Sequence, residues 1–464
     1  MRAKRTLLSI ALIFGSACGG AKPAPVQPRP LTTAPAKPAP AKATFPGAPA
    51  TPAGEQLAWI LDVIVHRHGK VERAELEAHF APGFLQEVPA DKLIQILPEM
   101  AGQLPGLAIN TVEGSDDRLV AHALVGKAKL QISLALTPER TQIAALSIQP
   151  ENDGTKPQSF EEALHAAAQI APRAQLLVAE LDHGQCKPLQ ELSASDELAI
   201  GSTFKLYVLT ALADQVIAGK LKWTDDVAVR DDWKSLPSGT TQNEAPGTKL
   251  KVQDLAERMI SISDNTAADH LIYTLGRKQV EAAVRATKHA KPALDTPFLS
   301  TRELFVLKLG TPDAEIDKYL KLPEAGRRAY LDKTLAGKAP KIDKIVEWKT
   351  ARRIDKLEWF ASSNDLCRTM AGLWTRAQND KAKPVLDVLA KNPGLPVDKK
   401  VWTYVGFKGG SEPGVLNVTY LLRRADDKWF VITLGFNADE GKELEDTKVF
   451  NLATGLIDLV GEAR

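Results

Sequence analysis

Alternating apolar and polar residues mark strands near both ends of the C-terminal two thirds of the chain. "AQLLVAELD" at 174–182 reads as one strand, and "VWTYVGFKGG", "GVLNVTYLLRR" and "KWFVITLGFN" read as three more between 401 and 437. Helical periodicity fills the region between them and also marks "SFEEALHAAAQIA" and "TKVFNLATGLIDLVGEA" at the two ends. The outer strands must therefore pair across the whole domain, which predicts an α+β domain over residues 159–464.

Residues 55–150 show a second, smaller pattern. Helical stretches ("EQLAWILDVIVHRHG", "RAELEAHF", "DKLIQILPEMAGQ") precede alternating segments ("RLVAHALVG", "AKLQISLALT", "QIAALSIQP"). Helices followed by a meander predict a small α+β domain. His66 and His68 have no third ligand at metal spacing, so we interpret them as solvated histidines at a helix end.

The N-terminus has the pattern of an export signal. "MRAKRTLLSIALIFGSAC" combines a basic start, an apolar run too short to span a bilayer, and small residues before Cys18. We expect residues 1–18 to be this signal and the Pro/Ala-rich residues 19–54 to be a linker. The ending resembles a bacterial lipoprotein signal, in which the cysteine is acylated. Gly15 replaces the usual leucine, so plain secretion stays open.

Composition and charge add several expectations. At 464 residues and 44% hydrophobic content, the chain has enough apolar residues for at least two cores. Lys+Arg number 59 against 57 Asp+Glu, which disfavours a nucleic-acid partner, and we expect a monomer. Cys186 and Cys367 lie far apart in sequence, and we predict two separate buried residues rather than a disulfide. The charged block from Asp313 to Trp359 predicts helices with a solvated face.

The stretch "LAIGSTFKLYVLTALAD" places Ser202 and Lys205 at the start of an apolar helix. A spacing of three puts both side chains on one helix face, so the amine reaches the hydroxyl. A lysine in a partly apolar cleft has a lowered pKa and acts as a base, and a serine at a helix N-terminus gains from free N–H groups. An ordinary helix start is the alternative.

Two later segments carry compatible groups. "SISDNTAADHLI" places Ser263, Asp264 and Asn265 between two helices, where they serve either a proton relay and an amide contact or a capping turn. "GFKGGSEPG" places Lys408 at the end of a strand, followed by two glycines that let a ligand approach the backbone. A hairpin turn explains the glycines equally well.

Ser-x-x-Lys, Ser-Asp-Asn and Lys-Gly-Gly in this order resemble the penicillin-recognising serine enzymes, nearest to class A β-lactamases. The resemblance covers about residues 159–464. It implies that Ser202 is the acylated nucleophile and Lys205 its partner in proton transfer. It further implies that Ser263 relays the proton and that Lys408 supports the site and helps bind the substrate carboxylate. It also implies that Asn265 holds the acyl amide, that Gly410 lies against the substrate, and that Ser411 donates the second oxyanion N–H. Asp264 is expected to brace its loop. The front domain looks similar to cystatin-like or nuclear-transport-factor-like folds.

Three departures from the family pattern matter for function. Gly409 stands where the family has a hydroxyl, and Ser411 is the possible replacement. The deacylating glutamate has only one weak candidate, Glu303 in "LSTRELFVLKLG", against the alternative of a helix-surface carboxylate. Arg423 and Arg424 fall at the far end of their strand, away from the position of the usual substrate-binding arginine.

No HExxH, Gly-x-Ser-x-Gly or clustered Cys/His pattern occurs in the sequence, so we expect no metal and no cofactor. The sequence predicts a serine acyl-transfer hydrolase acting on a β-lactam, an ester or a related cyclic amide. A D,D-peptidase and a non-enzymatic envelope lipoprotein that keeps the fold are the alternatives. With Cys18 acylated, the protein is expected on the periplasmic side of a membrane or at the cell surface.

Overall fold

The computed structural model describes residues 45–126, 128–150, 156–444 and 446–463. The chain divides into two compact units, residues 1–154 and 155–464. Each unit mixes helices with an antiparallel sheet, so the α+β class is confirmed. Cys18, the rest of the expected export signal and most of the expected linker lie outside the described residues. Within the described part, no helix is long and apolar enough to cross a bilayer.

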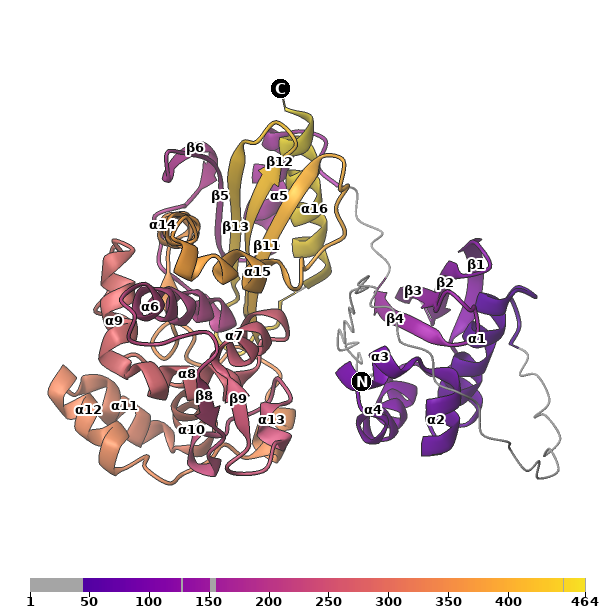
Figure 1. Cartoon of the computed structure of the whole chain (residues 1–464), viewed down its shortest axis with the longest axis horizontal. Coiled ribbons are helices and arrows are strands. Elements are labelled where there is room, and N and C mark those ends of the chain that lie inside the picture. Colours follow the sequence, from indigo (N-terminus) through magenta and orange to yellow (C-terminus); the bar gives the residue numbers. More distant parts are fainter. Residues whose placement is uncertain (1–44, 127, 151–155, 445, 464) are drawn as a thin grey trace, which may run out of the picture. The chain divides into compact units, whose positions relative to one another are not determined.

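The front unit packs helices on a four-stranded sheet of order β1-β2-β3-β4 (Figure 1). Alternate residues of β2 and β3, such as Ala121 and Ile132, join the helices in one apolar core, as a strand period of two requires. The predicted helices and three strands are confirmed, and β1 adds a fourth strand. The elements are α1 Pro52–Leu61, η1 Asp62–His66, α2 Arg73–His79, α3 Pro82–Glu87, α4 Ala90–Gln103, β1 Ala108–Gly114, β2 Arg118–Val125, β3 Ala128–Leu136 and β4 Ile143–Pro150.

His66 and His68 are exposed at the end of η1, and His66 Nδ1 lies 2.9 Å from Asp62 Oδ1. The interpretation as solvated histidines is confirmed.

The second unit is built on a five-stranded antiparallel sheet of order β11-β12-β13-β5-β6. Successive residues of β5 face opposite sides: Leu176 and Val178 pack under α5 and α16, whereas Leu177 and Ala179 pack against the helical part. The strands and terminal helices expected from the sequence are confirmed, and β6 is added. Their bounds are α5 Phe160–Ile170, β5 Arg173–Asp182, β6 Gln185–Leu192, β11 Trp402–Glu412, β12 Val415–Arg424, β13 Trp429–Asn437 and α16 Asp446–Glu462.

The helical part lies between β6 and β11 in the sequence. It carries two short sheets, β7 with β10 and β8 with β9. The expected helices in the charged block are α11 to α13, whose side chains are mostly exposed apart from Ile316, Tyr319 and Leu331. The elements are β7 Leu198–Ala199, η2 Gly201–Phe204, α6 Lys205–Ile217, β8 Asp226–Ala228, η3 Asp231–Trp233, η4 Thr241–Asn243, β9 Lys249–Lys251, α7 Val252–Ser261, α8 Asn265–Leu275, α9 Arg277–Ala286, α10 Thr301–Gly310, α11 Asp313–Lys321, α12 Glu324–Lys333, α13 Ile342–Glu347, β10 Phe360–Ala361, α14 Ser363–Arg376, η5 Asp380–Ala382 and α15 Pro384–Ala390.

Cys186 and Cys367 form a disulfide, so the prediction of two separate residues is wrong. Cys186 lies on β6 and Cys367 on α14, with their Cα atoms 6.3 Å apart across 181 residues of sequence. The error has a physical cause: α14 packs against the sheet beside β6, a contact that the spacing of the two cysteines in the sequence does not reveal.

Candidate active site

Ser202 lies in η2, the short turn between β7 and α6. Gly201 before it has a φ of 48°, in the left-handed region, and a Cβ added there would lie 3.1 Å from the Ser411 nitrogen. A larger residue would therefore meet both backbone strain and the adjacent strand β11. Glycine at position 201 lets the Ser202 backbone lie directly against β11.

Lys205, the first residue of α6, is the centre of the hydrogen-bond network. Its Nζ lies 3.0 Å from Ser202 Oγ, 3.0 Å from Ser263 Oγ, 2.7 Å from the Ser263 carbonyl and 2.7 Å from Asn265 Oδ1. The side chain is fully buried among these groups. The prediction that the Lys205 amine reaches the Ser202 hydroxyl is confirmed, although Ser202 lies in η2 and not in α6, which begins at Lys205.

Burial lowers the pKa of Lys205 to about 7, against the nearby carboxylates of Asp264 and Asp269, which act to raise it. Burial also lowers the pKa of Lys408 well below its ordinary value, and the charge of Lys205 adds to that effect. At neutral pH, at least one of the two amines therefore favours its uncharged form.

Ser263 stands between α7 and α8 with a φ of 56°, an unusual conformation for a residue with a side chain. Asp264 holds the turn: its Oδ1 accepts the Ala267 N–H at 2.8 Å, and its Oδ2 accepts two further backbone N–H groups. The expectation that Asp264 braces the loop is confirmed. The turn presents Ser263 and Asn265 to Lys205, so a capping role and a site role occur together in one segment.

Lys408 approaches the same serine from β11. Its Nζ donates to Ser263 Oγ at 3.1 Å and also to the Gly409 carbonyl. A Cβ on Gly410 would lie 2.7 Å from the Ser202 nitrogen and 2.1 Å from the Ile200 carbonyl, so only glycine allows this approach. The structure therefore brings together the three sequence motifs, with the backbone of Gly410 and Ser411 beside Ser202.

Glu303 does not lie in this network. Its two carboxylate oxygens accept the Arg277 guanidinium at 2.6 and 2.9 Å, and Oε2 also accepts the Ser300 N–H at 2.8 Å. The side chain is largely buried, so the surface alternative is also wrong. The described contacts of this carboxylate join it to Arg277 and the start of α10 rather than to the Ser202 network, so Glu303 is a poor candidate for the base.

Asp269 is a buried acid near the site, and it was not predicted from the sequence. It follows Asn265 by one turn of α8, and its oxygens accept the N–H groups of Thr301 and Arg302 at 2.7 and 2.9 Å. Burial raises its pKa to about 7. Its spacing of four from Asn265 was the available signal, because it places both residues on one helix face.

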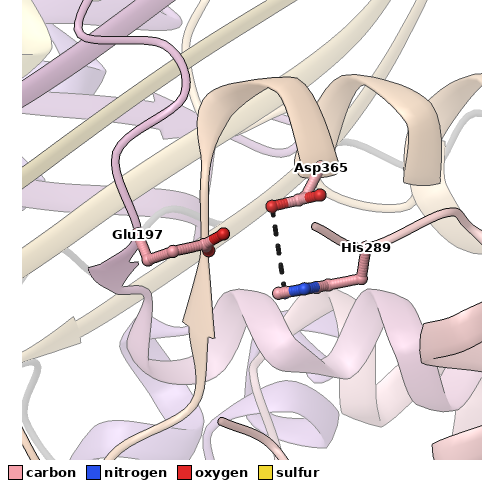
Figure 2. Close-up of side chains that lie close together, drawn as sticks. All are labelled: Glu197, His289 and Asp365. Atoms are coloured by element: carbon pink, nitrogen blue, oxygen red, sulfur yellow. Dashed lines mark ion pairs between the residues drawn. The ribbon is translucent and has the colours of Figure 1, made fainter. Parts of the chain in front are cut away.

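Glu197, which directly precedes β7, forms a second cluster with His289 and Asp365 (Figure 2). His289 Nδ1 accepts the Lys291 N–H at 3.0 Å, so Nε2 carries the hydrogen and donates to the Phe360 carbonyl at 2.9 Å.

Asp365 in the same cluster has no free oxygen lone pair for a metal. Its oxygens accept Ala290 N–H, both donors of Ser362 and the Arg368 guanidinium. Among the residues that the structure describes, neither buried oxygen of Glu197 has a hydrogen-bond partner, and burial, followed by the charge of Asp365, raises the pKa of Glu197 to about 7. These three residues are therefore suited to hold a proton rather than a metal ion.

The sheet flanked by α5 and α16, together with the helical part, forms a β-lactamase-type fold that holds the Ser202 network, and sequence comparison agrees. A model described as the beta-lactamase enzyme family matches residues 159–453. The chain therefore belongs to this family. A second model, described as the N-terminal part of the ORF 12 gene product, matches residues 48–140.

Solved structures show similar folds at low identity. The β-lactamase from Sphaerobacter thermophilus DSM 20745 is 18% identical, with a TM-score of 0.46, covering 66% of this chain and 98% of its own. The β-lactamase from Chitinophaga pinensis DSM 2588 is 17% identical, with a TM-score of 0.45, covering 65% and 98%. PBP-A is 15% identical, with a TM-score of 0.43, covering 66% and 100%. No curated protein matches the chain.

Proposed function

We propose that this chain is a serine acyl-transfer hydrolase that works through an acyl-enzyme on Ser202. The observation that carries the proposal is the contact of Lys205 Nζ with both Ser202 Oγ and Ser263 Oγ, each at 3.0 Å, in a buried site. An amine with a pKa of about 7 has a large neutral fraction at physiological pH and accepts the serine proton. The substrate is a β-lactam, an ester or a related cyclic amide.

The first half of the reaction forms the acyl-enzyme. Ser202 Oγ attacks the carbonyl carbon as its proton moves to Lys205, and the backbone N–H groups of Ser202 and Ser411 donate to the developing oxyanion. The bond to the leaving group then breaks, and Ser263 passes the proton to that group. Asn265 orients the acyl amide, and Lys408 supports the charge that develops at Ser263.

The second half of the reaction needs a water molecule and a base. Glu303 is held by Arg277, which removes the one candidate that the sequence offered for this role. General-base assistance is typically worth about 10²–10⁴-fold in rate. We therefore propose that turnover of ordinary penicillins is slow and limited by deacylation, whereas small or reactive esters leave room for water from solvent.

The pairing of Glu303 with Arg277 also favours a second candidate function, a non-enzymatic envelope protein that keeps the fold for binding. Mass spectrometry after exposure to penicillin G or p-nitrophenyl acetate distinguishes these candidate functions. An added acyl mass on Ser202 that decays within minutes supports the hydrolase. An adduct that is permanent with both reagents points to a peptidase, whereas no adduct from either reagent refutes the proposed function and favours the binding protein.

The matched variants for this experiment are Ser202→Ala and Ser195→Ala. Ser195 is an exposed hydroxyl that accepts a hydrogen bond from Asn364 and contacts no group of the site network in the described residues. Labelling should vanish in Ser202→Ala and persist in Ser195→Ala. Equal labelling of the two variants would place the chemistry on another residue.

We further propose export with a lipid anchor at Cys18, followed by the linker. The disulfide between Cys186 and Cys367 supports export, because such bonds persist in oxidising compartments. Fractionation of a Cys18→Ser protein tests the anchor: release from membranes is expected, and unchanged membrane association would contradict lipidation.

A further inference from the structure

A buried ion triad lies in the helical part next to the Ser202 turn. Lys308 on α10 has a fully buried side chain whose Nζ lies 2.6 Å from Glu358 Oε1 and 2.5 Å from Glu412 Oε1. Both carboxylates are also buried. Within the described residues, the ring of Trp348 lies 5.3 Å from the ammonium and completes its surroundings. A desolvated charge of this kind persists only where its partners are held in place, so the triad joins the three segments rigidly.

Glu412 connects the triad to one flank of the nucleophile. It directly follows Ser411 at the end of β11. On this flank, a Cβ added to Gly201 would meet the Ser411 nitrogen at 3.1 Å, which places β11 against the backbone that carries Ser202. A shift of Glu412 therefore moves the Ser411 N–H relative to Ser202.

Glu358 connects the triad to the opposite flank. Its Oε2 accepts the Trp359 N–H at 3.2 Å. The Trp359 carbonyl accepts the Ile200 N–H at 3.0 Å, and the Trp359 ring stacks on Phe204 with centroids 3.8 Å apart. The segment from Ile200 to Phe204 is thus held between Trp359 on one side and the end of β11 on the other.

We propose that Lys308 is a positioning residue for this site, because its ammonium ties Glu412 to Glu358 and so sets the separation of the two segments that flank Ser202, the end of β11 and the residues just before β10. The inference rests on the proposed function in one respect: the Ser411 N–H is taken as an oxyanion donor. No acid or base in the reaction is assigned to the triad.

The protonation state of the triad guides the choice of variants. Burial, followed by the charge of Glu358, raises the pKa of Glu412 well above its ordinary value, which favours a proton on Glu412. Lys308→Met therefore removes the tie without leaving two bare charges together. Glu412→Gln keeps an oxygen for Lys308 and serves as the conservative variant. Arg376→Met is the matched control, since Arg376 ties α14 to Asp214 of α6 at 2.7 Å.

The test uses the full chain and measures the burst rate constant and KM with p-nitrophenyl acetate. It also measures the Kd of phenylboronic acid, because the tetrahedral adduct of this compound on serine places an oxygen at the oxyanion position. Loss of one oxyanion donor typically costs about 10²–10³-fold in rate. For a displaced donor we expect Lys308→Met to slow acylation by about 10–100-fold with KM changed less than about twofold, and to weaken boronate binding by a similar factor. Glu412→Gln should retain most of the rate, and Arg376→Met all of it.

Thermal stability separates positioning from simple support of the fold. If Lys308→Met and Arg376→Met lower Tm alike but both acylate like the parent, the triad is structural only and the proposal is wrong. If the parent itself forms no adduct, the proposed function fails, and amide hydrogen exchange then decides the positioning claim. Faster exchange in the peptides around Ile200 and Ser411 in Lys308→Met, but not in Arg376→Met, supports it, and equal exchange overturns it.

Discussion

Lys205 should give acylation a steep dependence on pH near neutrality. Its pKa moves from the ordinary 10.5 to about 7 because the side chain is buried. At pH 7 about half of the amines are then neutral, whereas an ordinary lysine is neutral in about one molecule in 3,000. Burial thus supplies about a thousandfold more of the basic form.

The neutral fraction of Lys205 rises from about 0.1 at pH 6 to about 0.9 at pH 8, so we expect the burst rate constant to rise about tenfold over this range. The assay is stopped-flow release of p-nitrophenol from its acetate ester, read at the isosbestic wavelength and corrected for spontaneous hydrolysis. Lys205→Arg keeps a cation that does not lose its proton, and it should slow the burst by at least about 10²-fold at every pH.

A burst rate that stays flat from pH 6 to pH 8, or a Lys205→Arg protein that acylates at the parental rate, would refute Lys205 as the base. The linked effect on stability has a fixed sign. Because the folded pKa lies below the unfolded one, the folded state binds fewer protons, so the contribution of Lys205 to stability is full above pH 10.5 and is lost as pH falls toward 7.

Three further predictions concern stability and turnover. The pKa of Glu197 is raised from the unfolded value of 4.5 to about 7 in the folded protein, so its protonated form stabilises the fold fully below pH 4.5 and this stabilisation is lost as pH rises through 7. Calorimetry should therefore show Tm falling by a few degrees more in the parent than in Glu197→Gln between pH 5 and pH 8. An equal fall in both proteins would contradict this. Replacing Cys186 and Cys367 by serine should cost about 2–5 kcal/mol in urea unfolding, and the parent should match the variant once reduced. Glu303→Gln should lower Tm by weakening the Arg277 pair while leaving the burst and the slow penicillin turnover unchanged; collapse of rapid turnover would restore Glu303 as the base.

Local sequence signals located most of the fold and three parts of the site. The strand period of two placed β5 and β11 to β13, and residue type with spacing predicted the contact of Ser202 with Lys205, whereas Ser263 was assigned to the site through the resemblance of the three motifs. These signals work because each depends on residues close together in the chain. The disulfide, the Arg277 pair of Glu303 and the Lys308 triad could not be predicted in this way. Each joins segments that meet only after the helical part has packed against the sheet, and no periodicity encodes that contact.

The strand order of the second unit has a consequence for the time at which the protein becomes reactive. Lys408 follows Ser202 by 206 residues (408 − 202), and the whole helical part is synthesised between β6 and β11. Since β11 must pair before Lys408 and the Ser411 N–H reach the turn, a ribosome-bound or partly translocated chain carries Ser202 without these groups. Such long-range closure is slow compared with local helix formation. Under the export proposed above, the serine stays chemically silent throughout synthesis and passage across the membrane, and acquires its reactivity only where the complete chain folds.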